Sequence, residues 1–223
     1  MENPETLIAS AKYTIGQLNA ASPAVHYQYE QHARAATNYV DRSQLMYNPA
    51  RLDEQVWVVE SLQRFAQGSG GRLKDVALWC EMQWNRVLQY HAENLNALQG
   101  LGNSWLSRAQ APLARIRAAE ASHSGSSSSD DEAEAERLRH TQDYVEARTL
   151  LLPATEFLRR AVSAARMTGR LTGGLLVTSA EASIELGNVS YRSQSLPHFE
   201  DAVRSLREAE AIPSFRLSDR LSG

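Results

Sequence analysis

The sequence predicts an all-helical (all-α) protein. Apolar residues recur every three or four positions along most of the 223 residues, which is the spacing of one face of a helix. Only 12 glycines and 7 prolines interrupt the chain, and most of the prolines fall where helices would begin or end. No segment shows the strict alternation of apolar and polar residues that is typical of a strand. Hydrophobic residues make up 43% of the chain, so we expect a folded core.

The first half of the chain is predicted to form four helices. Ser22 followed by Pro23 has the pattern of an N-cap with proline in the first turn, and it separates the first helix from the second. The glycine-rich stretch 68–71 ends the third helix, because glycine readily adopts the left-handed conformation found at helix C-termini. The expected ranges are 5–20, 22–40, 51–67 and 73–93.

The second half is predicted to hold a further set of helices around a polar loop. Pro112 should open a new helix, and Pro153 should kink or split another, because proline removes a backbone donor and crowds the preceding turn. Residues 122–133 are rich in serine and acidic residues and contain no large apolar residue, so we expect a flexible loop there. The expected helices are 94–108, 112–121, 134–166, 175–193 and 196–211.

These elements suggest a division of the chain into five parts. They are an N-terminal helical region (1–70), a helical segment (71–121), the serine and acidic loop (122–133), a second helical segment (134–213) and a loose tail (214–223).

Composition excludes several classes of protein. The formal net charge is −3, whereas a nucleic-acid binder usually carries a basic excess, so no nucleic-acid partner is expected. Cys80 is the single cysteine, which excludes a disulfide within the chain. The first 20 residues lack the pattern of a secretory signal, and no stretch approaches the roughly 18 apolar residues that cross a bilayer. We therefore expect no membrane partner and a cytoplasmic or nuclear location.

Two segments of the sequence share a motif. Residues 98–105 and 184–191 each contain Leu-Gly-Asn with an aromatic residue close behind, Trp105 in the first and Tyr191 in the second. Each segment is followed by two alanines seven positions apart, which are Ala114 and Ala121, and Ala202 and Ala209. The pattern resembles the tetratricopeptide repeat (TPR), a helix–turn–helix unit of 34 residues. The small residues would let neighbouring helices nest closely. In the second segment the aromatic residue falls one position late, and two extra residues precede Ala202.

The resemblance implies antiparallel helix pairs stacked as a short TPR-like α-solenoid, with a groove that holds a partner peptide or helix. Asn103 and Asn188 would then face the groove and contact the partner. Gln99 and Ile184 stand where some members of the family carry a lysine that clamps a terminal carboxylate, so we do not expect carboxyl-terminal peptides as ligands. Ala154 and Ala161, seven apart after Pro153, would belong to a degenerate third unit.

Other residues were weighed as candidate sites. Gly100-Leu101-Gly102 and Thr172-Gly173-Gly174 follow no predicted strand, and the six histidines are scattered, so we expect no cofactor, metal or catalytic residue. Cys80 is interpreted as an inert core thiol. A core position is favoured for each of the four tryptophans, Trp57, Trp79, Trp84 and Trp105. Trp79 and Trp84, five apart, should point in different directions from one helix. The serines at Ser126, Ser127, Ser128 and Ser129 precede acidic residues and are candidate phosphorylation sites.

The function predicted from the sequence is that of a protein–protein interaction adaptor, or a subunit of a larger complex. The protein partner is not identified by the sequence, and self-association is compatible with it. The alternative is a compact helical bundle that acts as a regulatory or homodimeric subunit. A helical enzyme or small-ligand carrier is a third class, and it is disfavoured because no catalytic constellation stands out.

Overall fold

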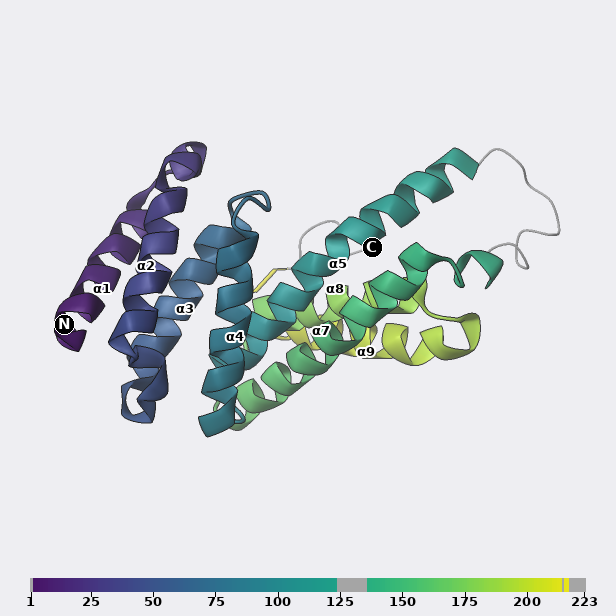
Figure 1. Ribbon diagram of the computed structural model, residues 1–223. Coiled ribbons are helices and arrows are strands. Elements are labelled where there is room, and N and C mark those ends of the chain that lie inside the picture. The colour runs from purple at the N-terminus through teal and green to yellow at the C-terminus, as the bar shows by residue number, and fades with distance from the viewer. Residues whose placement is uncertain (1, 124–135, 214, 217–223) are drawn as a thin grey trace. The chain divides into compact units, whose positions relative to one another are not determined.

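The computed structural model describes residues 2–123, 136–213, 215 and 216. These residues form helices and the turns between them, and no strand occurs among them, as the sequence predicts. The chain divides into two compact units, Met1–Leu101 and Gly102–Gly223. Helix α5 crosses the boundary between them (Figure 1).

The first unit contains two helical hairpins. Helices α1 (Pro4–Ala20) and α2 (Glu30–Ser43) form the first hairpin, and α3 (Leu52–Gln67) and α4 (Lys74–Tyr90) form the second. Three 3₁₀ segments join these helices: η1 (Pro23–Tyr29), η2 (Leu45–Tyr47) and η3 (Pro49–Arg51). The second expected helix therefore begins as a 3₁₀ turn and becomes α-helical only at Glu30.

The two hairpins of the first unit stack with corresponding helices parallel. Along α1 and α3, the contacts Glu5–Arg51, Lys12–Glu54 and Asn19–Ser61 advance in the same direction on both helices. Along α2 and α4, the contacts Glu30–Arg72, Arg34–Asp75 and Asp41–Trp79 do the same. The first helices of the two hairpins, α1 and α3, therefore pack on each other, and so do the second helices, α2 and α4.

The second unit also contains two hairpins. Helix α5 (Leu95–His123) runs antiparallel to α7 (Gln142–Met167), as shown by contacts of Gly102 with Leu158 at one end and of Glu120 with Tyr144 at the other. Helices α8 (Gly173–Val189) and α9 (Arg192–Glu210) form the second hairpin. Arg117 on α5 pairs with Glu185 on α8, and Arg166 on α7 pairs with Glu208 on α9.

One expected boundary, between residues 108 and 112, is wrong. Residues 95–123 form one continuous helix with Pro112 inside it, so this part of the chain has no helix–turn–helix unit. The reason lies in the core: Ala109, Leu113 and Ile116 continue one buried stripe across the proline. Burial of the last two side chains, about 1.5–3 kcal/mol each, offsets the roughly 3 kcal/mol that proline costs inside a helix.

A second correction concerns the expected helix 134–166. It is interrupted by a turn at residues 139–141, and α7 then runs unbroken through Pro153. The turn is stabilised by hydrogen bonds to its own carbonyl groups. The Thr141 hydroxyl donates to the Leu138 oxygen at 2.7 Å, and Arg148 donates to the Arg139 oxygen at 2.8 Å.

The remaining boundaries agree with the sequence to within a few residues. The third helix ends at Gln67 as expected, although the left-handed residues are Gly70 and Gly71 rather than Gly68. Most of the predicted loop 122–133 and most of the tail 214–223 lie outside the described residues. Within the tail, Phe215 packs against Gly173 at the start of α8. No helix in the described part of the chain combines the length and the apolar character needed to cross a membrane.

Candidate functional site

The small residues of the shared motif do not all lie between helices. Gly102, Gly187, Ala202 and Ala209 are buried, but Ala114 and Ala121 are exposed on α5. The expectation that all six positions allow helices to nest is therefore wrong for the pair that follows the first Leu-Gly-Asn. Because α5 continues past Pro112, these two alanines lie on a face of the helix that no described element covers.

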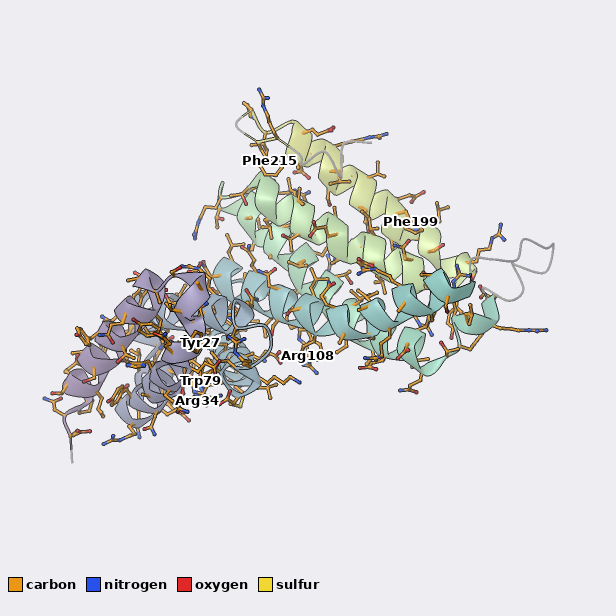
Figure 2. The ribbon with its side chains drawn as sticks, turned by 90° about the horizontal axis from the view of Figure 1, so that it is seen from above. Tyr27, Arg34, Trp79, Arg108, Phe199 and Phe215 are labelled. Atoms are coloured by element: carbon orange, nitrogen blue, oxygen red, sulfur yellow. The ribbon has the colours of Figure 1, made fainter. Side chains whose placement is uncertain are left out.

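The two motif glycines do mark close approaches between helices. A Cβ atom at Gly102 would lie 2.6 Å from Leu158 Cγ of α7, and one at Gly187 would lie 2.8 Å from the Phe199 ring of α9. The neighbours are Leu158 and Phe199, so the aromatic residues Trp105 and Tyr191 are not the side chains that fill these spaces. Figure 2 labels Phe199 on α9.

The asparagines predicted to contact a partner lie at different levels of the second unit. Asn103 is half-buried beside Gly102, and Asn188 is exposed at the end of α8. Gly102 meets Leu158 of α7, whereas Val189, next to Asn188, accepts a hydrogen bond from Arg148 of α7. At a rise of about 1.5 Å per residue, these two points of α7 are about 15 Å apart. The two asparagines thus belong to separate parts of the unit and form no single clamp.

Arg148 stabilises the C-terminal end of helix α8. Its guanidinium donates to the Val189 oxygen at 2.6 Å and lies 4.5 Å from the centre of the Tyr191 ring. A cation at a helix C-terminus is favourable because the last carbonyl groups lack partners within the helix. Tyr191 also stacks on His140 with ring centres 4.9 Å apart. Tyr191, the expected motif aromatic, thus contributes to a turn-stabilising cluster.

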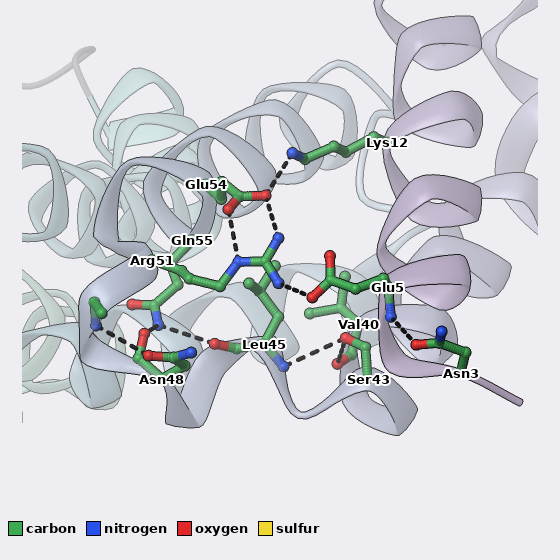
Figure 3. Close-up of polar contacts among 11 residues, drawn as sticks. Asn3, Glu5, Lys12, Val40, Ser43, Leu45, Asn48, Arg51, Glu54 and Gln55 are labelled. Carbon is green, nitrogen blue, oxygen red and sulfur yellow. Dashed lines mark hydrogen bonds and ion pairs between the residues drawn. The ribbon is translucent and has the colours of Figure 1, made fainter. Parts of the chain in front are cut away.

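In the first unit, a charged cluster joins α1 to the start of α3 (Figure 3). Arg51 donates from Nε to Glu54 Oε1 at 2.6 Å and from Nη1 to Glu5 Oε1 at 2.6 Å, and Lys12 pairs with Glu54 from the other side. Hydrogen bonds from Arg51 and Lys12 lower the pKa of Glu54 to about 2, and the hydrogen bonds of Arg51 to Glu54 and Glu5 raise the pKa of Arg51. Beside this cluster, Gln55 Nε2 donates to the Leu45 and Asn48 oxygens at 2.9 and 2.6 Å.

Similar ion pairs occur between the other parallel helices. The pKa of Asp75 is lowered by a hydrogen bond from Arg34, across α2 and α4, and the pKa of Glu208 is lowered by one from Arg166, across α7 and α9. A lowered carboxyl pKa at a functional site can indicate acid–base chemistry, but ion-pair networks that hold a fold together produce it as well. Because all three lowered carboxylates join stacked helices, we interpret them as structural.

The tryptophans and the cysteine of α4 lie in the core. Trp79 and Trp84 are 7% and 1% exposed, so neither is an exposed anchor, and the core position favoured for each is confirmed. Trp79 Nε1 donates to Asp41 Oδ1 at 2.9 Å. Cys80 is fully buried, and burial raises the pKa of its thiol, which agrees with an unreactive thiol.

Large exposed apolar side chains lie elsewhere, and one of them, Trp57, corrects the core position expected for it. Leu78 and Met82 of α4 are 53% and 59% exposed, and Tyr47 is 58% exposed. Tyr13 of α1 is 71% exposed, and Trp57 of α3 is 39% exposed. Only the i, i+4 spacing of Leu78 and Met82 could have indicated a shared face from the sequence.

The candidate phosphorylation sites Ser126, Ser127, Ser128 and Ser129 lie outside the described residues. Within the described ranges, no group of three or more histidine, cysteine, aspartate or glutamate side chains is arranged to hold a metal ion.

Comparisons with known proteins add little to this geometry. No family model matches the chain, and no curated protein matches it. A solved structure described as "DHF119 filament" aligns with 93% of this chain and 92% of its own, at 19% sequence identity and a TM-score of 0.33. A likeness at that score carries no argument about fold or function.

Proposed function

We propose that this protein is a non-enzymatic interaction adaptor, or a subunit of a larger complex, that binds a partner peptide or helix through stacked helix pairs. The observation that carries the proposal is the parallel stacking of successive hairpins in the first unit. Lys12–Glu54 and Asn19–Ser61 join α1 to α3, and Arg34–Asp75 joins α2 to α4. Helix pairs repeated in this way present long faces made of equivalent helices, and proteins built so commonly use those faces to bind other proteins.

The stacked hairpins resemble a solenoid, but the length of the repeating unit differs from that of a tetratricopeptide repeat. Helix α1 begins at Pro4, α3 at Leu52 and α5 at Leu95, which are intervals of 48 and 43 residues. Both exceed the 34 residues of a tetratricopeptide unit. The α8–α9 hairpin retains the motif glycine at a close helix contact and buries Ala202 and Ala209, so it is the part that agrees best with the family pattern.

Site-specific photo-crosslinking in the cells that produce the protein tests the proposal. A photoreactive amino acid replaces Asn103 or Asn188, the residues predicted to face a partner, and in a control it replaces Gln67 at the exposed end of α3. We expect a discrete adduct with one other protein from an asparagine position and none from Gln67. A chain that gives no adduct at either asparagine, and that elutes alone when the cell extract is fractionated, would contradict the proposal.

The same experiment separates the alternative function. An adduct with twice the mass of the chain would indicate a homodimeric helical bundle in place of an adaptor. Mass spectrometry of the adduct distinguishes the two outcomes directly.

A further inference from the structure

We infer that one face of α4 is the docking ridge for an acidic, amphipathic helix of a partner protein; the inference rests on the proposed function and names a surface and a partner chemistry for it. The ridge consists of Lys74, Leu78, Met82 and Arg86, with Tyr47 of η2 beside it. Four residues at i, i+4 spacing lie in one row along a helix, and such rows are the ridges that pack into the grooves of a neighbouring helix. The row spans about 18 Å at 1.5 Å per residue.

The centre of the ridge is apolar and open. Leu78 and Met82 are 53% and 59% exposed, and the 58% exposed ring of Tyr47 lies under the Arg86 guanidinium at 4.0 Å. Single exposed apolar side chains are ordinary, but two on adjacent turns of α4, with the Tyr47 ring of η2 beside Arg86 at the end of the row, form a patch of the kind that binds proteins. Methionine suits such a surface because its flexible side chain adapts to different partners.

The fold does not need these residues for its own core. Helix α4 already packs against α3, with Cys80 against the Val59 oxygen and Trp84 hydrogen-bonded to Gln63, and Val76 and Val87 of α4 are buried as well. Trp79 reaches Asp41 of α2, so the side toward α2 is occupied as well. The ridge is thus a third face of α4, and no described element packs on Leu78 or Met82.

The charges at the two ends of the ridge indicate the chemical character of the partner. Most cations of the first unit pair with a carboxylate inside the unit, namely Lys12, Arg34, Arg42, Arg51, Arg64 and Arg72. Lys74 and Arg86 have no carboxylate partner among the described residues. Arg86 donates instead to Gln83 Oε1 at 2.8 Å and to the Tyr47 hydroxyl at 3.1 Å.

A partner that covers this ridge must therefore bring carboxylates to both ends and apolar side chains to the middle. An amphipathic helix supplies both at the required spacing, because its own apolar row can pack beside Leu78 and Met82 while aspartate or glutamate residues lie a turn or two away on either side. Glu81 is about 100° round the helix from Met82, so it flanks the ridge and is not part of the row.

Selection from a display library of randomised 16-residue helical peptides, with the full chain as bait, tests the inference. We expect the enriched peptides to combine an apolar row with an excess of aspartate and glutamate. Binding of one enriched, fluorescently labelled peptide is then measured by anisotropy. The double variant K74E/R86E should weaken binding at least tenfold, and L78S/M82S should do the same. Added salt should weaken binding to the original chain more than to K74E/R86E.

A matched control separates the ridge from a general effect of charge. R204E/R207E on α9 makes the same change in net charge and should alter the affinity less than twofold. Circular dichroism melting curves of all variants show whether each still folds; L78S/M82S and K74E/R86E change only exposed or half-exposed side chains and should melt near the original temperature.

Several results would overturn the inference. They are a library that yields no binder, enriched peptides without an acidic excess, or equal binding to K74E/R86E and the original chain. Self-association that L78S/M82S abolishes would also overturn it, because a second copy would then be the occupant. If the photo-crosslinked partner still binds K74E/R86E and L78S/M82S, the proposed function stands and only this surface assignment fails.

Discussion

The indole Nε1 of Trp84 donates a hydrogen bond to Oε1 of Gln63 at 2.7 Å, in the core of the first unit. Gln63 is 7% exposed, and its Nε2 donates in turn to the Gly100 oxygen at 2.7 Å. One buried side chain thus joins α3, α4 and the start of α5. The rest of the contact is steric, since the indole lies directly against the Cα of Gly100.

The first prediction concerns the glycine of this contact. A Cβ at position 100 would lie 2.4–2.9 Å from the Trp84 ring, so Gly100→Ala must displace the indole or the helix. We expect the free energy of unfolding to fall by about 1–3 kcal/mol, as for other overpacked cores. Urea denaturation followed by tryptophan fluorescence measures the change. Gly16→Ala is the control: its site in α1 is open, so we expect it to stabilise the protein by about 0.5–1 kcal/mol. Equal effects of the two substitutions would contradict the packing described.

The second prediction concerns the amide that joins the three helices. Gln63→Ala leaves the buried Trp84 N–H without an acceptor, and an unsatisfied buried donor costs about 1–3 kcal/mol. We expect a corresponding loss of stability in thermal melts. Gln67→Ala, four residues later at the exposed end of α3, should change the stability by less than about 0.5 kcal/mol. A Gln63→Ala variant that is as stable as Gln67→Ala would show that the hydrogen bond contributes nothing.

The third prediction is a pH dependence that arises from Glu54. Its folded-state pKa is lowered to about 2 by Arg51 and Lys12, below the ordinary value near 4.5. A lowered pKa means that the stabilisation is present above the unfolded pKa and is lost as the pH falls from about 4.5 toward 2. We expect Glu54→Gln to be less stable than the original chain at pH 6 and equally stable near pH 2. Glu60→Gln, at an exposed pair with Arg64, should show little difference at either pH.

The fold class and the helix positions could be predicted because they depend on local spacing of apolar residues. Seven residues of the fourth helix were expected on one face. Five of them are buried, namely Leu73, Val76, Cys80, Trp84 and Val87, and Ala77 and Leu88 are half-buried. The missed boundaries occur where distant contacts outweigh local signals. Pro112 is a strong local break, but the residues on both sides of it pack into the same core.

The candidate surfaces were less predictable. The ion pairs that align parallel helices join residues that are far apart in the chain, such as Lys12 and Glu54, and charge spacing along one helix cannot reveal them. The four residues of the α4 ridge can be recognised in the sequence by their spacing. Whether that face of the helix is exposed to solvent depends on all the neighbouring elements, which the spacing does not reveal. The small residues at Ala114 and Ala121 matched a family motif and yet are exposed, because a motif match carries no information about the neighbouring helix.

The fourth prediction tests whether Phe215 is anchored on Gly173. A Cβ at position 173 would lie 2.2 Å from the Phe215 ring, so Gly173→Ala should displace the ring. The substitution should therefore destabilise the original chain and have a much smaller effect in a Phe215→Ala background. A double-mutant cycle from thermal melts measures the difference, which we expect to be about 0.5–3 kcal/mol for residues in contact. Additive effects would mean that the ring does not occupy the site.

The fifth prediction separates the two alanine pairs of the shared motif. Ala202 is 2% exposed, whereas Ala114 is exposed on α5. Ala202→Leu adds three carbon atoms to a packed interface between helices, and we expect it to cost about 1–3 kcal/mol. Ala114→Leu places the same side chain in open space on a helix, where leucine is nearly as favourable as alanine, so we expect a change within about 0.5 kcal/mol. Urea denaturation of the two variants gives the comparison. If Ala114→Leu were as damaging as Ala202→Leu, another element would have to cover α5 at that position.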